Sequence, residues 1–590
     1  MRAANGFLFM AMTALAAWRF SMAAEDGNGL LRLSIVDAAT GQPTSARVEV
    51  LDAKGKGYAA ADAIPVGQGY RERKRAWSGN LEQALALLSR SFENPYTQTT
   101  QFYIGGNSRL SLPPGRYRMT TYKGTEYEVQ TRDVSVQAGK TIDLSVAMTR
   151  WVNMPEKGWY SADDHLHISR PLPELNSVIS KWMQAEDINV ANLLQFGSSH
   201  QFLAAPQYAH GSAGVFRDGN YFLVAGQENP RTQFLGHALI LGAQSAIHIP
   251  DRYLIYKSFW DESRRQGGLN GYAHWGASAG APTGIAIDLP TRLLNFLEVL
   301  EAADANYDIW YDTLNSGYRL TPTAGTDYGS VPSIPGRERF YTEVKRPFTY
   351  AAWLDGIRRG RTFVTNGPVL EFNVEGKSIG DELVLEKPAT VLVEARVRFD
   401  PARDDVKRME IIRNGSLVGS FHRTGPPAQI RGGEVSRNGH VVRQFRREGL
   451  PSEIRCHFRL EIDETSWLAV RASGHKLGEA IPEGGLNPPF RDRGRGAYAT
   501  HAHSAPIFVT VRNTPSLAHQ PGGRTLARSW IARLDELESR LAEGNLKDLS
   551  EGIEDTVPNE ALIRRNRHEL LDGIATAKRL YREQVRLEVK

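Results

Sequence analysis

The segment Asp163-Asp164-His165-Leu166-His167 opens the part of the chain whose sequence pattern points most clearly to a fold. Residues two apart in a β-strand face the same way, so His165 and His167 can present two imidazoles to one metal ion. A single His-x-His is weak evidence, because two polar residues at the end of a strand also produce it. The sequence around the segment has to decide between these interpretations.

Apolar runs and helical periods alternate from Trp151 to about Pro368. Strand-like runs occupy residues 221–224, 237–241 and 296–300. Between them, helical spacing covers Ser177–Glu186, Tyr253–Arg265 and Tyr307–Asn315. Alternation of strands with helices predicts parallel pairing and either a barrel or a doubly wound sheet.

A His, Glu or Asp lies at the edge of most of these apolar runs. In parallel α/β barrels, the residues that bind ligands lie at the C-terminal ends of the strands. Seven of the fifteen histidines fall between His165 and His274, which is more clustering than unrelated surface or core histidines would show. We therefore expect one site to gather His165, His167, His200, Glu228, His237, His274 and Asp327.

Neighbouring residues are candidates for supporting roles. Asp163 or Asp164 could orient an imidazole that binds metal. Arg231 and Tyr328 are candidates for contacting substrate, although both are equally well explained as ordinary loop residues.

The flanking sequence has β character on both sides and helical character at the end. Residues 26–150 alternate apolar and polar positions, and "LPPGRY" (112–117) resembles a turn of the carboxypeptidase regulatory-like β-sandwich. Residues 66–101 look like an irregular insertion. Residues 371–512 are again β-like, with an Asn-Gly hairpin signal at 414–415, and residues 513–590 have helical spacing.

The N-terminus, the charge and the cysteine content narrow the class of protein. Residues 1–24 have the basic start, apolar run and small residues of a cleaved signal peptide, which predicts a periplasmic or secreted protein without stable membrane insertion. The net charge of +5 over 590 residues gives no electrostatic footprint for nucleic acid. Cys456 is the only cysteine, which excludes an internal disulfide and a cysteine-rich zinc site.

Four motifs resemble, in order, the metal motifs of the PHP (polymerase and histidinol phosphatase) superfamily. They are His165-x-His167, "GQE…GHALILG" (226–242), "AHWG" (273–276) and "AGTD" (324–327). The arrangement is most similar to the CehA/McbA branch, named for carbaryl hydrolase, and "GRTFVTNGP" (360–368) resembles the segment that closes its hydrolase domain.

The resemblance implies a distorted (β/α)7 barrel over residues 151–370, flanked by β-sandwich domains and followed by a helical segment. It also implies two or three divalent ions, zinc first and manganese or iron as alternatives. His165 and His167 would bind the first ion, and Glu228 would bridge. His200, His237 and His274 would complete the other sites, and Asp327 would bind an ion or the attacking water.

Two departures from the family pattern favour two ions over three. The acid that often follows the His-x-His is represented only by Glu174, beyond two prolines. The last motif is often Asp-x-His, whereas Tyr328 and Gly329 follow Asp327 here.

We therefore expect hydrolysis of a small-molecule ester, carbamate, amide or phosphoester by metal-activated water, with Glu228 and Asp327 as catalytic residues. No Gly-x-Ser-x-Gly elbow offers a serine nucleophile instead. One alternative is a non-catalytic exported protein that binds a carbohydrate or cell surface through a degenerate barrel. Another is a metal with a purely structural role. The sequence does not indicate an oligomeric state.

Overall fold

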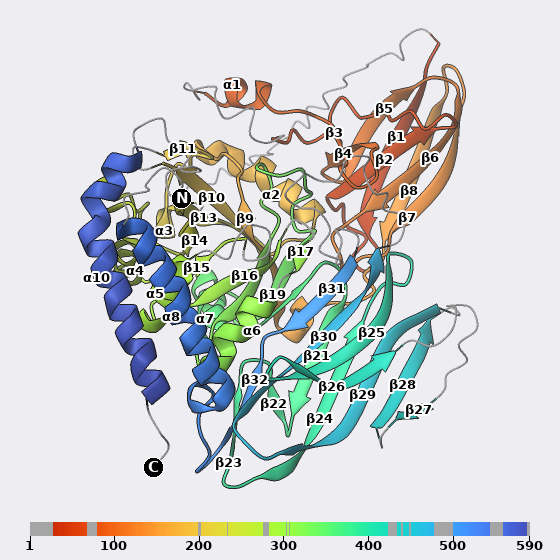
Figure 1. Ribbon diagram of the computed structural model, residues 1–590. Coiled ribbons are helices and arrows are strands. Elements are labelled where there is room, and N and C mark those ends of the chain that lie inside the picture. Colours follow the sequence, from red (N-terminus) through yellow and green to blue (C-terminus); the bar gives the residue numbers. More distant parts are fainter. Residues whose placement is uncertain are drawn as a thin grey trace, which may run out of the picture.

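The computed structural model describes most of the chain, and the central strands lie between the helices and the two outer β parts (Figure 1). The described residues are 27–67, 80–198, 202–232, 234–274, 283–301, 304–305, 307–422, 434–437, 440–447, 450–476, 499–542 and 559–586. The expected signal peptide (1–24) and His200 lie outside them. Within these ranges, no helix combines the length and the apolar character needed to cross a membrane.

The N-terminal part consists of two sheets that enclose a core of alternating apolar residues such as Leu31, Leu33 and Ile35. One sheet contains β5 (Asn107–Leu112), β1 (Gly29–Asp37) and β8 (Thr141–Met148), in that order. The other contains β3 (Phe92–Glu93), β4 (Thr100–Ile104), β2 (Ala46–Asp52), β6 (Gly115–Tyr122) and β7 (Gln130–Val136). The prediction of an irregular insertion over 66–101 was wrong for its later portion, because α1 (Leu81–Ala86) and β3 lie there and β3 pairs with β4.

The central part is a mixed α/β unit. Its principal strands are β9 (Trp159–Leu166), β10 (Val190–Gly197), β13 (Tyr221–Thr232), β14 (Gly236–Leu241), β15 (Leu269–Tyr272), β16 (Phe296–Glu301), β18 (Thr321–Gly325), β19 (Arg339–Glu343) and β20 (Thr362–Thr365). Short strands β11 (Phe202–Ala204), β12 (Phe216–Asp218) and β17 (Asp304–Ala305) lie beside them. The helices are α2 (Asn176–Ala185), α3 (Gly211–Gly214), α4 (Tyr256–Arg265), α5 (Gly284–Asp288), α6 (Asp308–Asn315) and α7 (Tyr350–Arg358).

Strand direction in the central part is only partly as expected. The pairs β9–β10, β10–β13, β15–β16 and β16–β18 are parallel. The expectation of parallel pairing was wrong for β14, which is antiparallel to both β13 and β15, and for β19, which is antiparallel to both β9 and β20. Only residues 233–235 separate β13 from β14, and a parallel connection needs a crossover of about a dozen residues or more.

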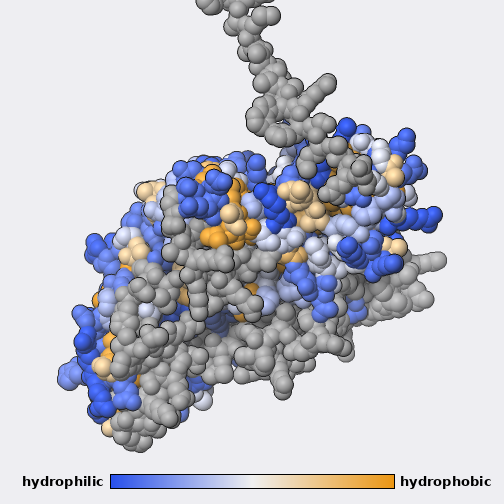
Figure 2. Space-filling model, turned by 90° about the horizontal axis from the view of Figure 1, so that it is seen from above, coloured by the Kyte–Doolittle hydropathy of each residue, from blue (hydrophilic) through white to orange (hydrophobic). Residues whose placement is uncertain are grey.

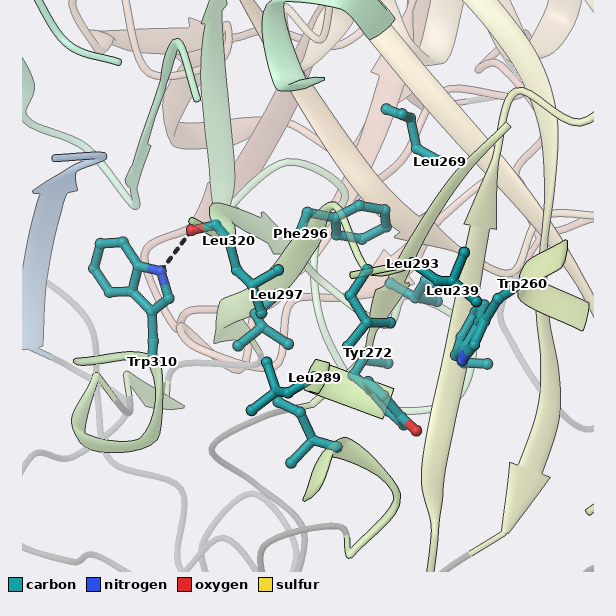
Figure 3. Close-up of a cluster of buried hydrophobic side chains, with 14 of the residues drawn as sticks. Leu239, Trp260, Leu269, Tyr272, Leu289, Leu293, Phe296, Leu297, Trp310 and Leu320 are labelled. Carbon is teal, nitrogen blue, oxygen red and sulfur yellow. Dashed lines mark hydrogen bonds between the residues drawn. The ribbon is translucent and has the colours of Figure 1, made fainter. Parts of the chain in front are cut away.

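Large apolar side chains from the strands and helices hold the central sheet in place (Figure 3). Trp260 of α4 and Tyr272 of β15 are fully buried, and both donate hydrogen bonds to Asp288, at 2.8 and 2.7 Å. Trp310 of α6 is fully buried as well, and its indole N–H donates to the Leu320 carbonyl at 2.8 Å. Truncation of either tryptophan to Ala would cost about 3–5 kcal/mol of stability.

The C-terminal β part joins the central sheet. A six-stranded sheet contains β22 (Lys377–Ser378), β21 (Val369–Val374), β24 (Ala389–Arg398), β29 (Leu450–Ile462), β28 (His440–Arg447) and β27 (Glu434–Arg437). A second group contains β23 (Glu382–Leu385), β25 (Asp404–Arg413), β26 (Ser416–His422), β30 (Ser466–Lys476), β31 (Ala499–Ser504) and β32 (Ile507–Val511). The Asn414-Gly415 hairpin is confirmed between β25 and β26, and β31 pairs antiparallel with β20.

Two long helices, α8 (Pro521–Ala542) and α10 (Asn559–Arg586), end the described chain and pack beside the central helices (Figure 1). The predicted helical spacing is confirmed, because Trp530, Leu534, Leu537 and Leu541 are all buried on one face of α8. The Tyr581 hydroxyl of α10 donates to the Ala286 carbonyl of α5 at 3.1 Å. The described surface in Figure 2 is mostly hydrophilic, with small hydrophobic patches.

Candidate metal centre

Side chains from six strands of the central sheet, β9, β13, β14, β15, β16 and β18, meet at one largely buried cluster. His165 lies near the end of β9 and His167 directly after it, Glu228 lies in β13 and His237 in β14. His274 follows β15, and Asp327 follows β18. The structure thus brings together six of the seven ligands expected from the sequence, and the seventh, His200, lies outside the described residues.

The ligand atoms are close enough to share metal ions. His165 Nε2 lies 3.2 Å from His167 Nε2 and 3.4 Å from Asp327 Oδ1. His167 Nε2 lies 3.0 Å from Asp327 Oδ1 and 3.2 Å from Glu228 Oε2. His274 Nε2 faces the same carboxylates from the other side, 3.5 Å from Glu228 Oε1 and 3.9 Å from Asp327 Oδ2.

Glu228 occupies the middle of the cluster. Its Oε1 lies 2.7 Å from His237 Nδ1, and its Oε2 lies 3.1 Å from Arg231 Nε. Complete burial opposes ionisation of Glu228, but Arg231 and the imidazoles of His237 and His165 together hold its pKa well below the usual range. Arg231 also stacks its guanidinium over Phe196, 4.4 Å from the ring centre. Arg231 therefore lies within the cluster, where it balances a carboxylate charge.

Two acidic residues of the cluster, Glu298 and Glu301 of β16, were missed in the sequence. Glu298 Oε2 and Oε1 lie 3.2 and 3.3 Å from His165 Nδ1, and Glu298 also accepts a hydrogen bond from the His274 backbone N–H at 2.8 Å. Glu301 Oε1 lies 3.8 Å from His274 Nε2. Their signal was the presence of two carboxylates in an otherwise apolar strand, because a buried charge needs a partner.

Among the described residues, neither Asp163 nor Asp164 is hydrogen-bonded to an imidazole, so the orienting role expected of them has no contact to support it. Asp163 accepts hydrogen bonds from the backbone of His165 at 3.0 Å, from Gly336 at 2.8 Å and from the Thr326 hydroxyl at 2.6 Å. Asp163 thus ties β9 to the segment that carries Asp327, and burial raises its pKa to about 7.

Strand β9 has an irregularity in its pairing with β10 between Asp163 and Leu166, so simple alternation does not place the side chain of Asp164, which lies close to Glu298. Burial and the charge of Glu298 raise the pKa of Asp164 well above its usual range. The imidazoles are oriented by other groups. Glu298 meets Nδ1 of His165, and the Leu194 carbonyl lies 3.0 Å from Nδ1 of His167.

Two of the cluster residues adopt a backbone conformation that most side chains avoid. His274 has a φ of 49° and Asp327 a φ of 44°, both in the left-handed region. Such conformations cost about 1–3 kcal/mol each and persist where the surroundings enforce them, often at functional sites. Here the His274 N–H is held by Glu298, and the Asp327 carbonyl accepts from the backbone of Ser330 and Val331.

Two other residues singled out in the sequence lie at the edge of the site or away from it. The Tyr328 hydroxyl donates to the Gly67 carbonyl, and its ring packs edge-on against Trp182. Glu174 is exposed and belongs to none of the groups that could hold a metal ion. The acids that accompany the histidines in the described chain are therefore Glu228, Glu298, Glu301 and Asp327.

The donor set fits divalent metal ions. When neutral His165 and His167 donate through Nδ1 to Glu298 and to the Leu194 carbonyl, both Nε2 atoms are left as acceptors. In that state the two Nε2 atoms face each other and carboxylate oxygens, which favours a cation between them. That cation is a metal ion or a proton on His165, because despite burial the carboxylates of Glu298, Asp327 and Glu228 raise the pKa of His165 well above its usual range. His274 Nε2 and Glu301 Oε2 are also buried without a hydrogen-bond partner. Imidazole and carboxylate ligands without sulfur suit zinc, manganese or iron.

Comparison with known proteins adds no family. No protein-family model matches the chain, and no curated protein matches it.

Proposed function

We propose that the chain is an exported, metal-dependent hydrolase of the PHP type, related to the CehA/McbA branch, which cleaves an ester, carbamate or phosphoester bond of a small molecule. The observation that carries the proposal is the buried cluster of imidazole and carboxylate acceptor atoms 3.0–3.6 Å apart. Acceptor atoms this close repel one another, and cations bound between them would remove the repulsion.

The position of the ligands supports a barrel of the PHP kind. His165, His274 and Asp327 each lie at or just beyond the C-terminal end of a strand, as catalytic groups do in α/β barrels. The cluster divides into overlapping groups: His165, His167 and Glu228; His165, His274 and Asp327; Glu228, His237 and His274; and His274, Glu298 and Glu301. Glu228 is the only carboxylate that belongs to two of these groups, and its two oxygens face different imidazoles, so it is the natural bridge between two ions.

Divalent ions held there would supply a water nucleophile near neutral pH and offset the charge that develops on a substrate oxygen. The side chains provide the rest. Despite its burial, Asp327 is held ionised by its contacts with His165 and His167, so it can bind a cation or accept a hydrogen bond from a water molecule beside it. Glu298 fixes the ring of His165, and Arg231 limits the net negative charge around Glu228.

The test is a double replacement, His165→Ala with His167→Ala, in the full chain. We expect metal content measured by elemental analysis to fall and hydrolysis of aryl esters or aryl phosphates, with zinc or manganese added, to be lost. Far-UV circular dichroism should stay unchanged. The two single replacements should each remove nearly as much activity as the pair, because ligands act as a unit.

The matched control is His568→Ala, since the side chain of His568 is 94% exposed and lies beside Asp572 on α10, away from the cluster residues in the sequence. It should retain metal and activity. Full activity in the double variant would refute the site. A wild-type protein that holds no metal and stays inert when metal is added would favour the alternative of a carbohydrate- or surface-binding protein.

A further inference from the structure

A cavity of about 360 Å³ lies where the N-terminal, central and C-terminal parts of the molecule meet. The N-terminal part contributes Arg47, Tyr96 and Tyr122 to its wall, the central part contributes Arg337 and Arg339, and the C-terminal part contributes Arg403. This volume falls within the range of cavities that bind small molecules.

The wall of this junction cavity has four guanidinium groups and one carboxylate. Arg47 pairs with that carboxylate, Glu186, at 2.7 Å, and Arg337 pairs with Glu338 just behind the wall. These two ion pairs neutralise two of the four positive charges.

The other two positive charges are balanced only by backbone carbonyls. Arg339 is 1% exposed and donates to the carbonyls of Gly336, Asp187 and Glu186. Arg403 donates to the Gly124 carbonyl at 2.6 Å. Over the ranges that the structure describes, no carboxylate lies within ion-pair distance of Arg339 or Arg403. A buried positive charge without a counter-ion, such as that of Arg339, is costly, and an anion in the cavity would offset that cost; Arg403 is partly buried and adds a second positive charge beside it.

Aromatic rings fix two of the guanidinium planes. The Arg337 guanidinium lies 3.9 Å from the centre of the Tyr96 ring, and that of Arg47 lies 4.4 Å from the centre of the Tyr122 ring. Stacked guanidinium groups present their N–H donors edgewise, in the geometry that matches the oxygens of a carboxylate or phosphate. The tyrosine rings also offer flat apolar surface to the carbon skeleton of a ligand.

We propose that the junction cavity binds a small organic anion through a carboxylate or phosphate group. Arg339 and Arg403 provide the charge that the anion neutralises. The occupant touches all three parts of the molecule, so its binding stabilises their arrangement. This site is separate from the metal centre and does not depend on the proposed hydrolase activity.

The experiment uses the full chain with two probes, inorganic phosphate and glucuronate, each compared with sodium chloride at equal ionic strength. Binding is measured by isothermal titration calorimetry, and stability by the thermal unfolding midpoint. We expect at least one probe to bind and to raise the midpoint above its value in chloride. Arg403→Gln should weaken that binding at least tenfold, while the matched control Arg512→Gln, at an exposed pair with Glu386, should leave it unchanged.

Phosphate bound at the metal centre would be recognised because Arg403→Gln would not weaken it. If Arg403→Gln does not fold, Arg403→Lys keeps the charge but loses the planar fork, and it should still weaken binding at least threefold. The proposal is overturned if neither probe binds more tightly than chloride. It is also overturned if binding is equal in wild type and in a folded Arg403 variant, which would leave Arg403 as a structural link to Gly124 alone.

Discussion

Replacement of Glu298 by Gln tests whether this residue positions the metal ligands. Glu298 is fully buried, and its two oxygens meet His165 Nδ1 at 3.2 and 3.3 Å and the His274 N–H at 2.8 Å. Gln can place its oxygen where Oε2 accepts from both donors, but its NH₂ then replaces Oε1, 3.3 Å from His165 Nδ1, and the negative charge that strengthens both contacts is lost. Loss of one charge-assisted hydrogen bond costs about 1.5–3 kcal/mol. A loss of this size agrees with the about 10–100-fold drop in metal affinity that follows removal of a group supporting a ligand.

The assay is a competition titration of zinc between the protein and a coloured chelator. We expect Glu298→Gln to weaken zinc binding by about 10–100-fold while the circular dichroism spectrum stays that of the wild type. Glu410→Gln is the matched control, because Glu410 is a buried glutamate whose carboxylate pairs with Arg471 at 2.6 Å in the C-terminal part. It should leave zinc affinity unchanged. A folded Glu298→Gln protein with zinc affinity within threefold of wild type would refute the reasoning.

Three further predictions concern single residues. A Cβ at position 325 would lie 2.5 Å from the Cβ of His165, so Gly325→Ala should destabilise the fold by about 1–3 kcal/mol and lower metal content. Gly522→Ala, where a Cβ would meet open space, should change neither stability nor metal content. Thermal unfolding and elemental analysis of the two variants would measure these two properties. Burial lowers the pKa of Lys123 from 10.5 to about 8. Between these pH values Lys123 is protonated in the unfolded chain but neutral in the folded protein, so the free energy of unfolding rises with pH. The free energy of unfolding of wild type relative to Lys123→Met should therefore grow by about 3 kcal/mol between pH 8 and 10.5, and a constant difference would contradict this. Burial raises the pKa of Cys456 to about 12, so at pH 8 a thiol reagent should modify the native protein at least 100-fold more slowly than the denatured protein, and equal rates would be inconsistent with its position.

The sequence predicted the centre of the site better than its surroundings. His165 and Asp327 were found because the ends of neighbouring strands in an α/β sheet lie close together, whatever their separation along the chain. Glu228 was found because it follows an apolar run, although β13 continues past it to Thr232. Glu298 was passed over because it lies inside an apolar strand that reads as core. Whether such a strand is buried on both faces, and against which charges, depends on neighbours that the local sequence does not reveal.

The flanking elements show the same limit. The helical spacing of α8 and the Asn414-Gly415 hairpin were visible because both signals are local. The direction of β14 could have been inferred from the short link at 233–235, which is too short for a crossover. The contacts of Asp163 could not be read from the sequence, because its carboxylate accepts hydrogen bonds from backbone N–H groups of two other segments.

The pairing of β31 with β20 has a practical consequence for anyone who wishes to isolate the metal centre. The hydrogen bond from the Thr365 hydroxyl to the His501 carbonyl joins residues 136 positions apart, and β20 is linked through β19 to β9, the strand that holds His165. A fragment of residues 151–370 would lack β31, the strand that pairs with β20. The unpaired backbone N–H and C=O groups of β20 would then be exposed and would favour aggregation. A fragment meant to keep the cluster of histidines and carboxylates in a folded sheet should therefore include β31.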